Sequence, residues 1–215
     1  MSIERFGLKA WPHLLVYLCC GVAAFMFPVR LGAEILKPEA ALQTFLETVR
    51  SMEFPVTDHL AHERLIRKAN AYLDLETMGK DALGGHWAQA TNEERNTFLD
   101  LMWQQIELVA YPQSREFLGD YEITYPEVRH LGNGFEIQSV VKQQEAALDA
   151  SVVYHLYEQD AQWKIDDIVL DDVSIIEDLS YQFEKIINDS SFGGLLERMR
   201  EKLRGVQEKR TGEAA

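Results

Sequence analysis

The hydrophobic pattern changes its period near Gly119, and this change constrains the fold more than any other feature of the chain. Before it, apolar side chains recur every three or four residues, which is typical of amphipathic helices. In residues 121–125, apolar and polar side chains alternate instead, which is typical of a strand with one buried face. The helical period returns in residues 178–187. Because helices and strands occupy separate stretches of the chain, this order predicts an α+β fold.

Four strands are expected after Gly119, at 121–125, 135–141, 148–158 and 163–170. The connections between them are short, and Gly132-Asn133-Gly134 has the composition of a tight turn. A parallel pair would need a crossover connection of a dozen or more residues. The four strands are therefore predicted to form an antiparallel sheet.

Helices are expected on both sides of the strands in sequence. Thr91 and Glu94 have the spacing of a capping box, which predicts the start of a long helix. That helix is apolar on more than one face, which is typical of a helix that is buried on several sides or lines a cavity. The other expected helices begin at Pro38 or span 58–73, 75–83, 178–187 and 193–203, and a polar tail follows at 205–215.

The amino terminus has the pattern of an export signal. Arg5 and Lys9 precede an uncharged apolar run at 14–27, and Ala33 is a small residue suited to cleavage. We therefore expect residues 1–33 to be a signal peptide. The run is shorter than the roughly 20 apolar residues of a membrane span, so a retained anchor is the alternative. Both cysteines of the chain lie in this segment, so the mature protein would hold no disulfide.

The charge of the chain excludes some partners. With 35 acidic and 21 basic residues, the formal net charge is -14. Residues 1–33 hold three basic and one acidic residue, so their removal leaves 18 against 34, a net charge of -16. Binding to nucleic acid, or electrostatic docking on a membrane surface of anionic lipid headgroups, depends on clusters of Lys and Arg. The sequence therefore predicts no nucleic acid partner, and it favours docking on basic patches of partner proteins.

Motifs for catalysis or metal binding are weak in this sequence. His59 and His62 are three residues apart on an expected helix, but no third zinc ligand is evident, and a solvated helix face is favoured. The acidic pairs 166–167 and 171–172 lack the spacing of a calcium loop. No Gly-x-Ser-x-Gly elbow or phosphate-binding loop is present. We therefore expect no metal site and no catalytic residues.

Several segments carry a resemblance to a known family. Residues 83–91 resemble its Leu-Gly-x-x-Trp-x-x-Ala-Thr segment, and 163–168 with 173–174 resemble its Trp-Lys-Val-x-Asp-Val…Val-Ser stretch. Gln182-Phe183 follows at the family's spacing, and Gly194-Leu195-Leu196 with Lys202 resembles its closing helix. In order and spacing, residues 38–203 resemble the MlaC family, the periplasmic phospholipid-binding proteins also known as toluene-tolerance auxiliary components of ABC transporters.

One departure from this pattern concerns the ligand. Family members often carry an aromatic residue and an arginine just before Gln-Phe, where this chain has Leu179 and Ser180. If that arginine contacts a lipid headgroup or a partner, this protein must make the contact in another way. A relative associated with hopanoid-producing bacteria belongs to the same broad family, so the resemblance also allows a triterpenoid or another lipid as the alternative to phospholipid.

The resemblance implies an α+β fold in which N-terminal helices, a four-stranded antiparallel curved sheet and C-terminal helices enclose an apolar cavity. Residues 34–204 would form a single lipid-binding domain. The implied function is that of a periplasmic carrier of Gram-negative bacteria that catalyses no reaction and has no cofactor besides its bound phospholipid. Its implied partners are an inner-membrane ABC transporter with an MCE-type ring protein and an outer-membrane lipoprotein complex.

Alternation on the strands and helical spacing predict which residues line the cavity. Because strand side chains alternate between faces, the opposite face of each strand is the main alternative. The residues expected to line the lipid-binding cavity are Phe98, Met102, Ile106, Tyr121, Ile123, Phe135, Ile137, Val141, Val153, Trp163 and Phe183.

Two other functions are open on the sequence alone. A curved sheet covered by helices around an apolar pocket also describes small enzymes of the ketosteroid-isomerase type, which use a buried carboxyl group for acid–base chemistry. Asp167 would be that carboxyl, because it lies within an otherwise apolar strand. This enzyme hypothesis requires Asp167 to face the cavity. The second alternative, an exported adaptor without a ligand, requires a filled core.

Overall fold

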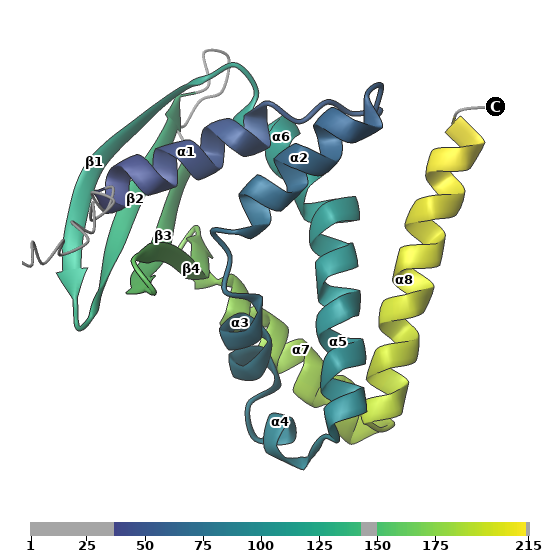
Figure 1. The fold of residues 1–215 in the computed structure, drawn as a ribbon. Helices are drawn as coiled ribbons and strands as arrows, with labels where there is room; N and C mark the ends of the chain where they lie inside the picture. Colours follow the sequence, from purple (N-terminus) through teal and green to yellow (C-terminus); the bar gives the residue numbers. More distant parts are fainter. Residues whose placement is uncertain (1–36, 143–149, 214–215) are drawn as a thin grey trace, which may run out of the picture. The chain divides into compact units, whose positions relative to one another are not determined.

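The expected order of helices, strands and helices is present in the computed structural model of the protein (Figure 1). The structure describes residues 37–142 and 150–213, which belong to a compact unit spanning 34–215. The expected signal peptide at 1–33 and the expected start of the third strand at 148 lie outside the described residues. Within the described residues, no helix is long and apolar enough to span a membrane.

The elements follow one another as α1 (Pro38–Arg50), α2 (His59–Asn70), α3 (Leu75–Leu83), α4 (Gly85–Gln89), α5 (Asn92–Gln105), the π-helix η1 (Ile106–Ala110), α6 (Tyr111–Leu118), β1 (Glu122–Leu131), β2 (Gly134–Lys142), β3 (Ala150–Gln159), β4 (Gln162–Leu170), β5 (Val173–Ser174), α7 (Ile175–Asp189) and α8 (Phe192–Glu213).

Side-chain caps mark the starts of α2, α3, α5 and α7. The first N–H groups of a helix have no partner within it, and a side-chain oxygen just before the helix can accept from them. Asp58, Asp74 and Ser174 accept such bonds at the starts of α2, α3 and α7. The capping box is confirmed, because Thr91 Oγ1 accepts from the Glu94 amide at 3.2 Å while the Thr91 amide donates to Glu94 Oε2 at 2.8 Å.

The sheet is antiparallel with the strand order β1-β2-β3-β4-β5, so the expected α+β class is confirmed and a short fifth strand is added. Its register pairs Ile137 with Tyr154 and Tyr154 with Ile168, which places these three side chains in one row on the inner face. The alternation is clear in β3, where Val152, Tyr154 and Leu156 are buried. Among the described residues, the helices cover this face, whereas outer-face side chains such as Gln138 and Val153 are half-buried.

The acidic pair Asp171-Asp172, weighed above as a metal site, forms the turn between β4 and β5. Both residues have positive φ values, 48° and 64°. Asp and Asn adopt this left-handed conformation more readily than most residues, and two consecutive positive φ values suit a two-residue hairpin turn. The turn therefore accounts for this pair without a bound cation.

The core lies where the helices meet the inner face of the sheet. Phe98 of α5 has no exposed surface, and its ring meets the edge of Phe183 of α7 at a centroid distance of 5.5 Å. Helix α3 approaches α5 closely at Gly79, where an added Cβ would lie 2.7 Å from Leu99 Cδ2. The buried aromatic pair and the close approach hold α3, α5 and α7 together.

Helix α8 is longer than the sequence pattern indicates. It continues to Glu213, whereas we expected the helix to end at 203 and a polar tail to begin at 205. Its second half makes a contact across 102 residues of sequence, because Arg210 Nη2 donates to the Leu108 carbonyl of η1 at 3.0 Å. The periodicity of a segment cannot reveal a hydrogen bond to a residue far away in the chain. The helix expected from periodicity was therefore too short.

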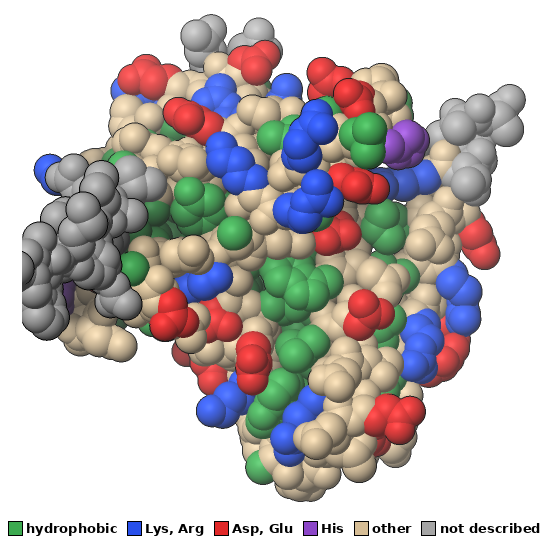
Figure 2. Space-filling model, in the orientation of Figure 1, with side chains coloured by type: hydrophobic (Ala, Val, Ile, Leu, Met, Phe, Trp, Pro, Cys, Tyr) green, Lys and Arg blue, Asp and Glu red, His purple; other side chains and the backbone are tan. Residues whose placement is uncertain are grey.

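Charged side chains of both signs are interspersed on the face of the molecule seen in Figure 1, and hydrophobic side chains gather between α3 and α5 (Figure 2). The acidic excess of the chain therefore forms no continuous patch on this face. Lys and Arg side chains are exposed on this face although the net charge of the chain is -14.

We expect Asp74 to make the stability of the protein sensitive to acid. Burial alone raises the pKa of this carboxyl, but hydrogen bonds from Tyr157 and Thr77 and the charge of Lys164 outweigh burial and lower the pKa below the usual 3.8. A lowered folded-state pKa gives stability that is complete above the unfolded-state value and is lost as the pH falls through the folded-state value.

The measurement is thermal unfolding between pH about 5 and about 2.5, the range in which carboxylates titrate. The stability difference between the wild type and Asp74→Asn should be largest above pH about 4 and shrink below it. Asp81→Asn, which alters an exposed carboxyl of the same helix, is the matched control. A difference for Asp74→Asn that is constant over the range would contradict this account.

Candidate ligand-binding cavity

A cavity of about 480 Å³ lies between the inner face of the sheet and the helices. Its apolar wall is formed by Phe45, Leu46, Val49, Leu73, Met78, Met102, Ile106, Val109, Ala110, Phe117, Leu118, Val152, Ile168, Leu170, Ile175, Leu179 and Phe183, together with the rings of Tyr111 and Tyr154. The remaining lining residues are Gln105, Gln113, Ser114 and Lys202. The site is therefore suited to an apolar ligand with a polar end.

One side of the cavity is a continuous helical segment formed by α5, η1 and α6. Ile106, Ala110 and Ser114 recur every four residues along this segment and all line the cavity. The segment includes one π-helical turn at 106–110, and such wide turns often occur at functional sites. Nothing in the sequence pattern indicated this turn.

A hydrogen-bond chain fixes the π-helical turn to α2. The Tyr111 hydroxyl donates to Asn70 Oδ1 at 2.7 Å, and Asn70 Nδ2 donates to Glu107 Oε1 at 3.0 Å. Burial, with a smaller effect of Glu107, raises the pKa of Tyr111 far above its usual value. The hydroxyl therefore stays protonated and continues to donate, which holds the tyrosine ring in the wall of the cavity.

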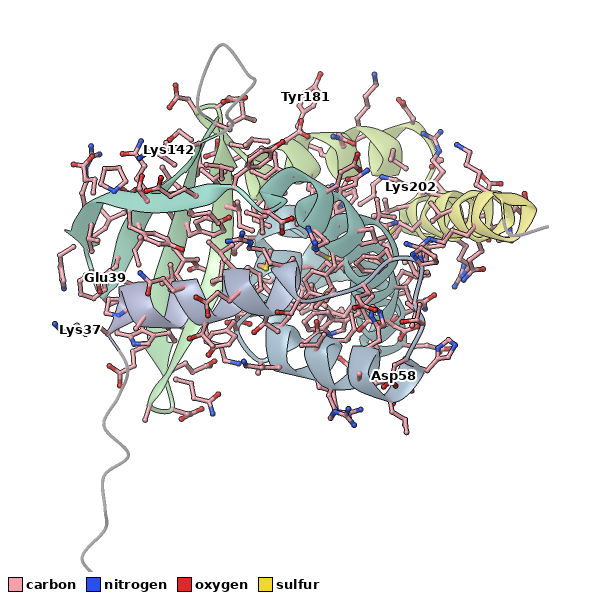
Figure 3. The ribbon with its side chains drawn as sticks, turned by 90° about the horizontal axis from the view of Figure 1, so that it is seen from above. Lys37, Glu39, Asp58, Lys142, Tyr181 and Lys202 are labelled. Carbon is pink, nitrogen blue, oxygen red and sulfur yellow. The ribbon has the colours of Figure 1, made fainter. Side chains whose placement is uncertain are left out.

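The cavity opens to solvent where lining residues are themselves exposed. These residues, Ala110, Gln113, Leu170, Ile175 and Lys202, define what we call the mouth. They come from η1, α6, β4, α7 and α8, so residues from three separate stretches of the chain contribute to the exposed part of the wall. Helix α1 runs across the sheet (Figure 3) and contributes buried side chains to the inner wall.

Three of the residues expected from the sequence, Met102, Ile106 and Phe183, lie in the cavity wall. Phe98, Ile137 and Val141 are fully buried in the core beside the cavity and are not part of its wall.

The other expected residues lie farther from the cavity. Ile123, Phe135 and Trp163 are half-buried against the core, and the Phe135 and Trp163 rings contact each other with centroids 5.5 Å apart. Tyr121 is 36% exposed, just before β1. Val153 lies on the opposite face of β3 from Val152 and Tyr154, which line the cavity.

Two physical reasons explain these differences. In β3, Val152, Val153 and Tyr154 are apolar and consecutive, so the sequence does not show which of them point to the inner face of the sheet. Phe135 and Trp163 lie on the inner face of the sheet, as expected. The cavity, however, lies at the other end of this face, beside Val152 and Leu170. Alternation identifies the inner face of a strand, but it does not show which part of that face is left uncovered by other side chains.

The α1 residues Phe45 and Val49 were missed, although their spacing of four residues marks an inward helix face.

Asp167, the residue required by the enzyme hypothesis, is not part of the cavity wall. Its carboxylate accepts from Ser174 Oγ at 2.6 Å, from the Ile168 amide at 2.7 Å and from the Ile176 amide at 3.3 Å. These bonds tie β4 to β5 and to the first turn of α7. The position of Asp167 thus supports a structural role.

Asp167→Asn is expected to lower the free energy of unfolding by about 1–3 kcal/mol, because hydrogen bonds accepted by a partly buried carboxylate are stronger than those between neutral groups. Chemical denaturation measures this loss. Asp171→Asn is the control, since this residue lies exposed in the following turn and Asn tolerates its positive φ. Unchanged stability of Asp167→Asn would contradict the structural role.

The two histidines weighed as zinc ligands lie on α2. The His62 ring meets the edge of Phe54 with centroids 5.3 Å apart, and burial lowers the pKa of His62. Within residues 37–142 and 150–213, no three His, Cys, Asp or Glu side chains lie close enough together to hold a metal ion. Aromatic packing therefore accounts for His62.

The fold and the cavity define a class: an α+β protein whose open antiparallel sheet and helices surround an apolar, solvent-connected cavity. The chain belongs to the MlaC family, because the family model described as MlaC protein matches residues 39–201. This match confirms the resemblance noted in the sequence.

One solved structure with a similar fold is a phospholipid-binding protein from Ralstonia solanacearum in complex with a phospholipid at a resolution of 1.53 Å. The two chains are 17% identical with a TM-score of 0.65, and the match covers 79% of this chain and 96% of that chain. No curated protein matches this chain.

Proposed function

We propose that this protein is a lipid carrier that holds the acyl chains of a phospholipid in the cavity and leaves the headgroup at the mouth. The observation that carries the proposal is an apolar cavity of about 480 Å³, open to solvent, in a chain of the MlaC family. Such a volume lies within the range of small-molecule sites. The phospholipid in the similar Ralstonia structure supports the choice of ligand.

The energetics of lipid transfer explain why a cavity is needed. Two acyl chains contain about 30 methylene groups, and exposing each to water costs about 0.8 kcal/mol, or on the order of 24 kcal/mol in total. Free diffusion of a lipid between membranes is therefore negligible. A cavity that offsets most of this cost also makes release slow, so that a partner must open it.

The expected signal peptide and the family suggest where the carrier works. We propose that residues 1–33 export the protein to the periplasm and that it catalyses no reaction there. It would shuttle lipid between an inner-membrane ABC transporter with an MCE-type ring protein and an outer-membrane lipoprotein complex, and so maintain lipid asymmetry and toluene tolerance. The net charge of -14 favours docking on basic patches of these partners.

The test is mass spectrometry of lipids extracted from the protein after purification from its native envelope without detergent. We expect a glycerophospholipid in amounts comparable to the protein. A triterpenoid in its place would assign the carrier to a hopanoid ligand. Protein that holds no lipid, even after incubation with phospholipid vesicles, would contradict the carrier function.

A further inference from the structure

Among the described residues of the cavity wall, one side chain is charged: Lys202 of α8, labelled in Figure 3, which is exposed and belongs to the mouth. Gln105, Gln113 and Ser114 are the uncharged polar residues of the wall, apart from the two tyrosines. Helix α7 contributes only Ile175, Leu179 and Phe183, which are apolar. A ligand with a negatively charged end thus meets a single cation among the described residues of the cavity wall.

The ammonium group of Lys202 is not neutralised by its neighbours on α8. Glu197 pairs with Arg200 at 3.5 Å and with Arg204 at 3.1 Å, and Glu201 lies 4.0 Å from Arg204. Glu197 and Glu201, the acidic residues of α8 closest in sequence to Lys202, thus pair with arginines of the same helix. No ion pair among the described residues includes Lys202.

The chemistry of lysine suits this position. Its four-carbon stem can lie along an apolar rim while the ammonium group stays in water, and that group offers three donors to phosphate oxygens. Near an apolar wall, the attraction between opposite charges is stronger than in bulk water. In a chain with a net charge of -14, an anionic headgroup would otherwise be repelled.

We propose that Lys202 binds the phosphate of the lipid headgroup and makes the cavity selective for phosphate-bearing lipids over neutral lipids with the same acyl chains. This inference rests on the proposed carrier function and adds the part of the ligand that the mouth recognises. Lys202 serves as a specificity-determining residue, while the apolar wall supplies most of the affinity.

The experiment offers the protein two lipids that differ only in the headgroup. Vesicles of dioleoylphosphatidylglycerol containing dioleoylglycerol are incubated with the protein, and the ratio of the two lipids on the re-isolated protein is measured by mass spectrometry. Lys202→Met keeps the length of the side chain and removes its charge. We expect this variant to lower the ratio of phospholipid to diacylglycerol about three- to tenfold, as the loss of one charge-assisted contact near the surface implies.

Two variants serve as controls. Lys202→Arg keeps the charge and should keep the wild-type ratio. Lys209→Met removes an exposed lysine seven residues further on, on the same face of α8 and outside the cavity wall, and should also leave the ratio unchanged. Inorganic phosphate, added against chloride of equal ionic strength, should leave the wild-type ratio unchanged as well.

Each outcome bears on the proposal. A wild-type ratio retained by Lys202→Met, or an equal loss of both lipids, would overturn the role of Lys202 and leave the carrier function standing. A wild-type ratio that inorganic phosphate lowers would assign Lys202 to free phosphate instead. Uptake of neither lipid by the wild type would overturn the carrier function itself.

Discussion

Ala110→Trp is expected to remove most lipid binding and to leave the fold intact. Ala110 is an exposed residue of η1 whose side chain lines the mouth, so an indole ring at this position can occupy the entrance. If the ring excludes four methylene groups from the cavity, the loss is about 3 kcal/mol, or roughly a hundredfold in affinity. Stability should not fall, because the new side chain enters space that no protein atom occupies.

The measurement is retention of phospholipid after incubation with vesicles, with thermal unfolding recorded in parallel. Ser114→Trp, one turn further along the same wall and half-buried, gives a second block if the first ring turns outward into solvent. Ala88→Trp makes the same substitution at an exposed alanine of α4 that is not part of the wall. Full retention of lipid by both wall variants would show that the ligand does not occupy this cavity.

Phe98→Ala is expected to destabilise the protein by about 3–5 kcal/mol, the usual cost of removing a buried aromatic ring. Phe98 has no exposed surface, and the substitution also removes the edge-to-face contact with Phe183. A loss of this size is a large part of the 5–15 kcal/mol that stabilises a typical domain.

Chemical denaturation tests this prediction, and Tyr181→Ala is the matched control. Tyr181 lies on α7, is 69% exposed and points away from the protein (Figure 3), so its loss should change stability by less than about 0.5 kcal/mol. Because Phe98 is not part of the cavity wall, folded Phe98→Ala should still bind lipid. Lost binding with unchanged stability would instead place Phe98 in the binding site, as the sequence alone predicted.

The fold was largely predictable because its signals are local. The capping box at Thr91, the helix start at Pro38 and the change of period at Gly119 each depend on neighbouring residues, and the structure has an element boundary at each of them. The extension of α8 and the π-helical turn at 106–110 were not predictable. They depend on bonds such as the one from Arg210 to Leu108, whose partners are far apart in the chain.

The site was less predictable than the fold. Periodicity identifies inward-facing residues, and Met102, Ile106 and Phe183 do line the cavity. Periodicity does not distinguish a side chain that fills the core, such as Ile137, from one that faces empty space, because both are apolar and both point inward.

The sequence by itself determined the α+β class, the antiparallel sheet and the MlaC family, because these depend on local patterns and on the order of motifs. Only the tertiary structure decided that the inner face of the sheet is filled at the Trp163 end and hollow at the Leu170 end. It also brought Lys202 to the mouth of that hollow. The physical reason is that a cavity is a property of the volumes of many side chains packed together, which no single stretch of sequence encodes.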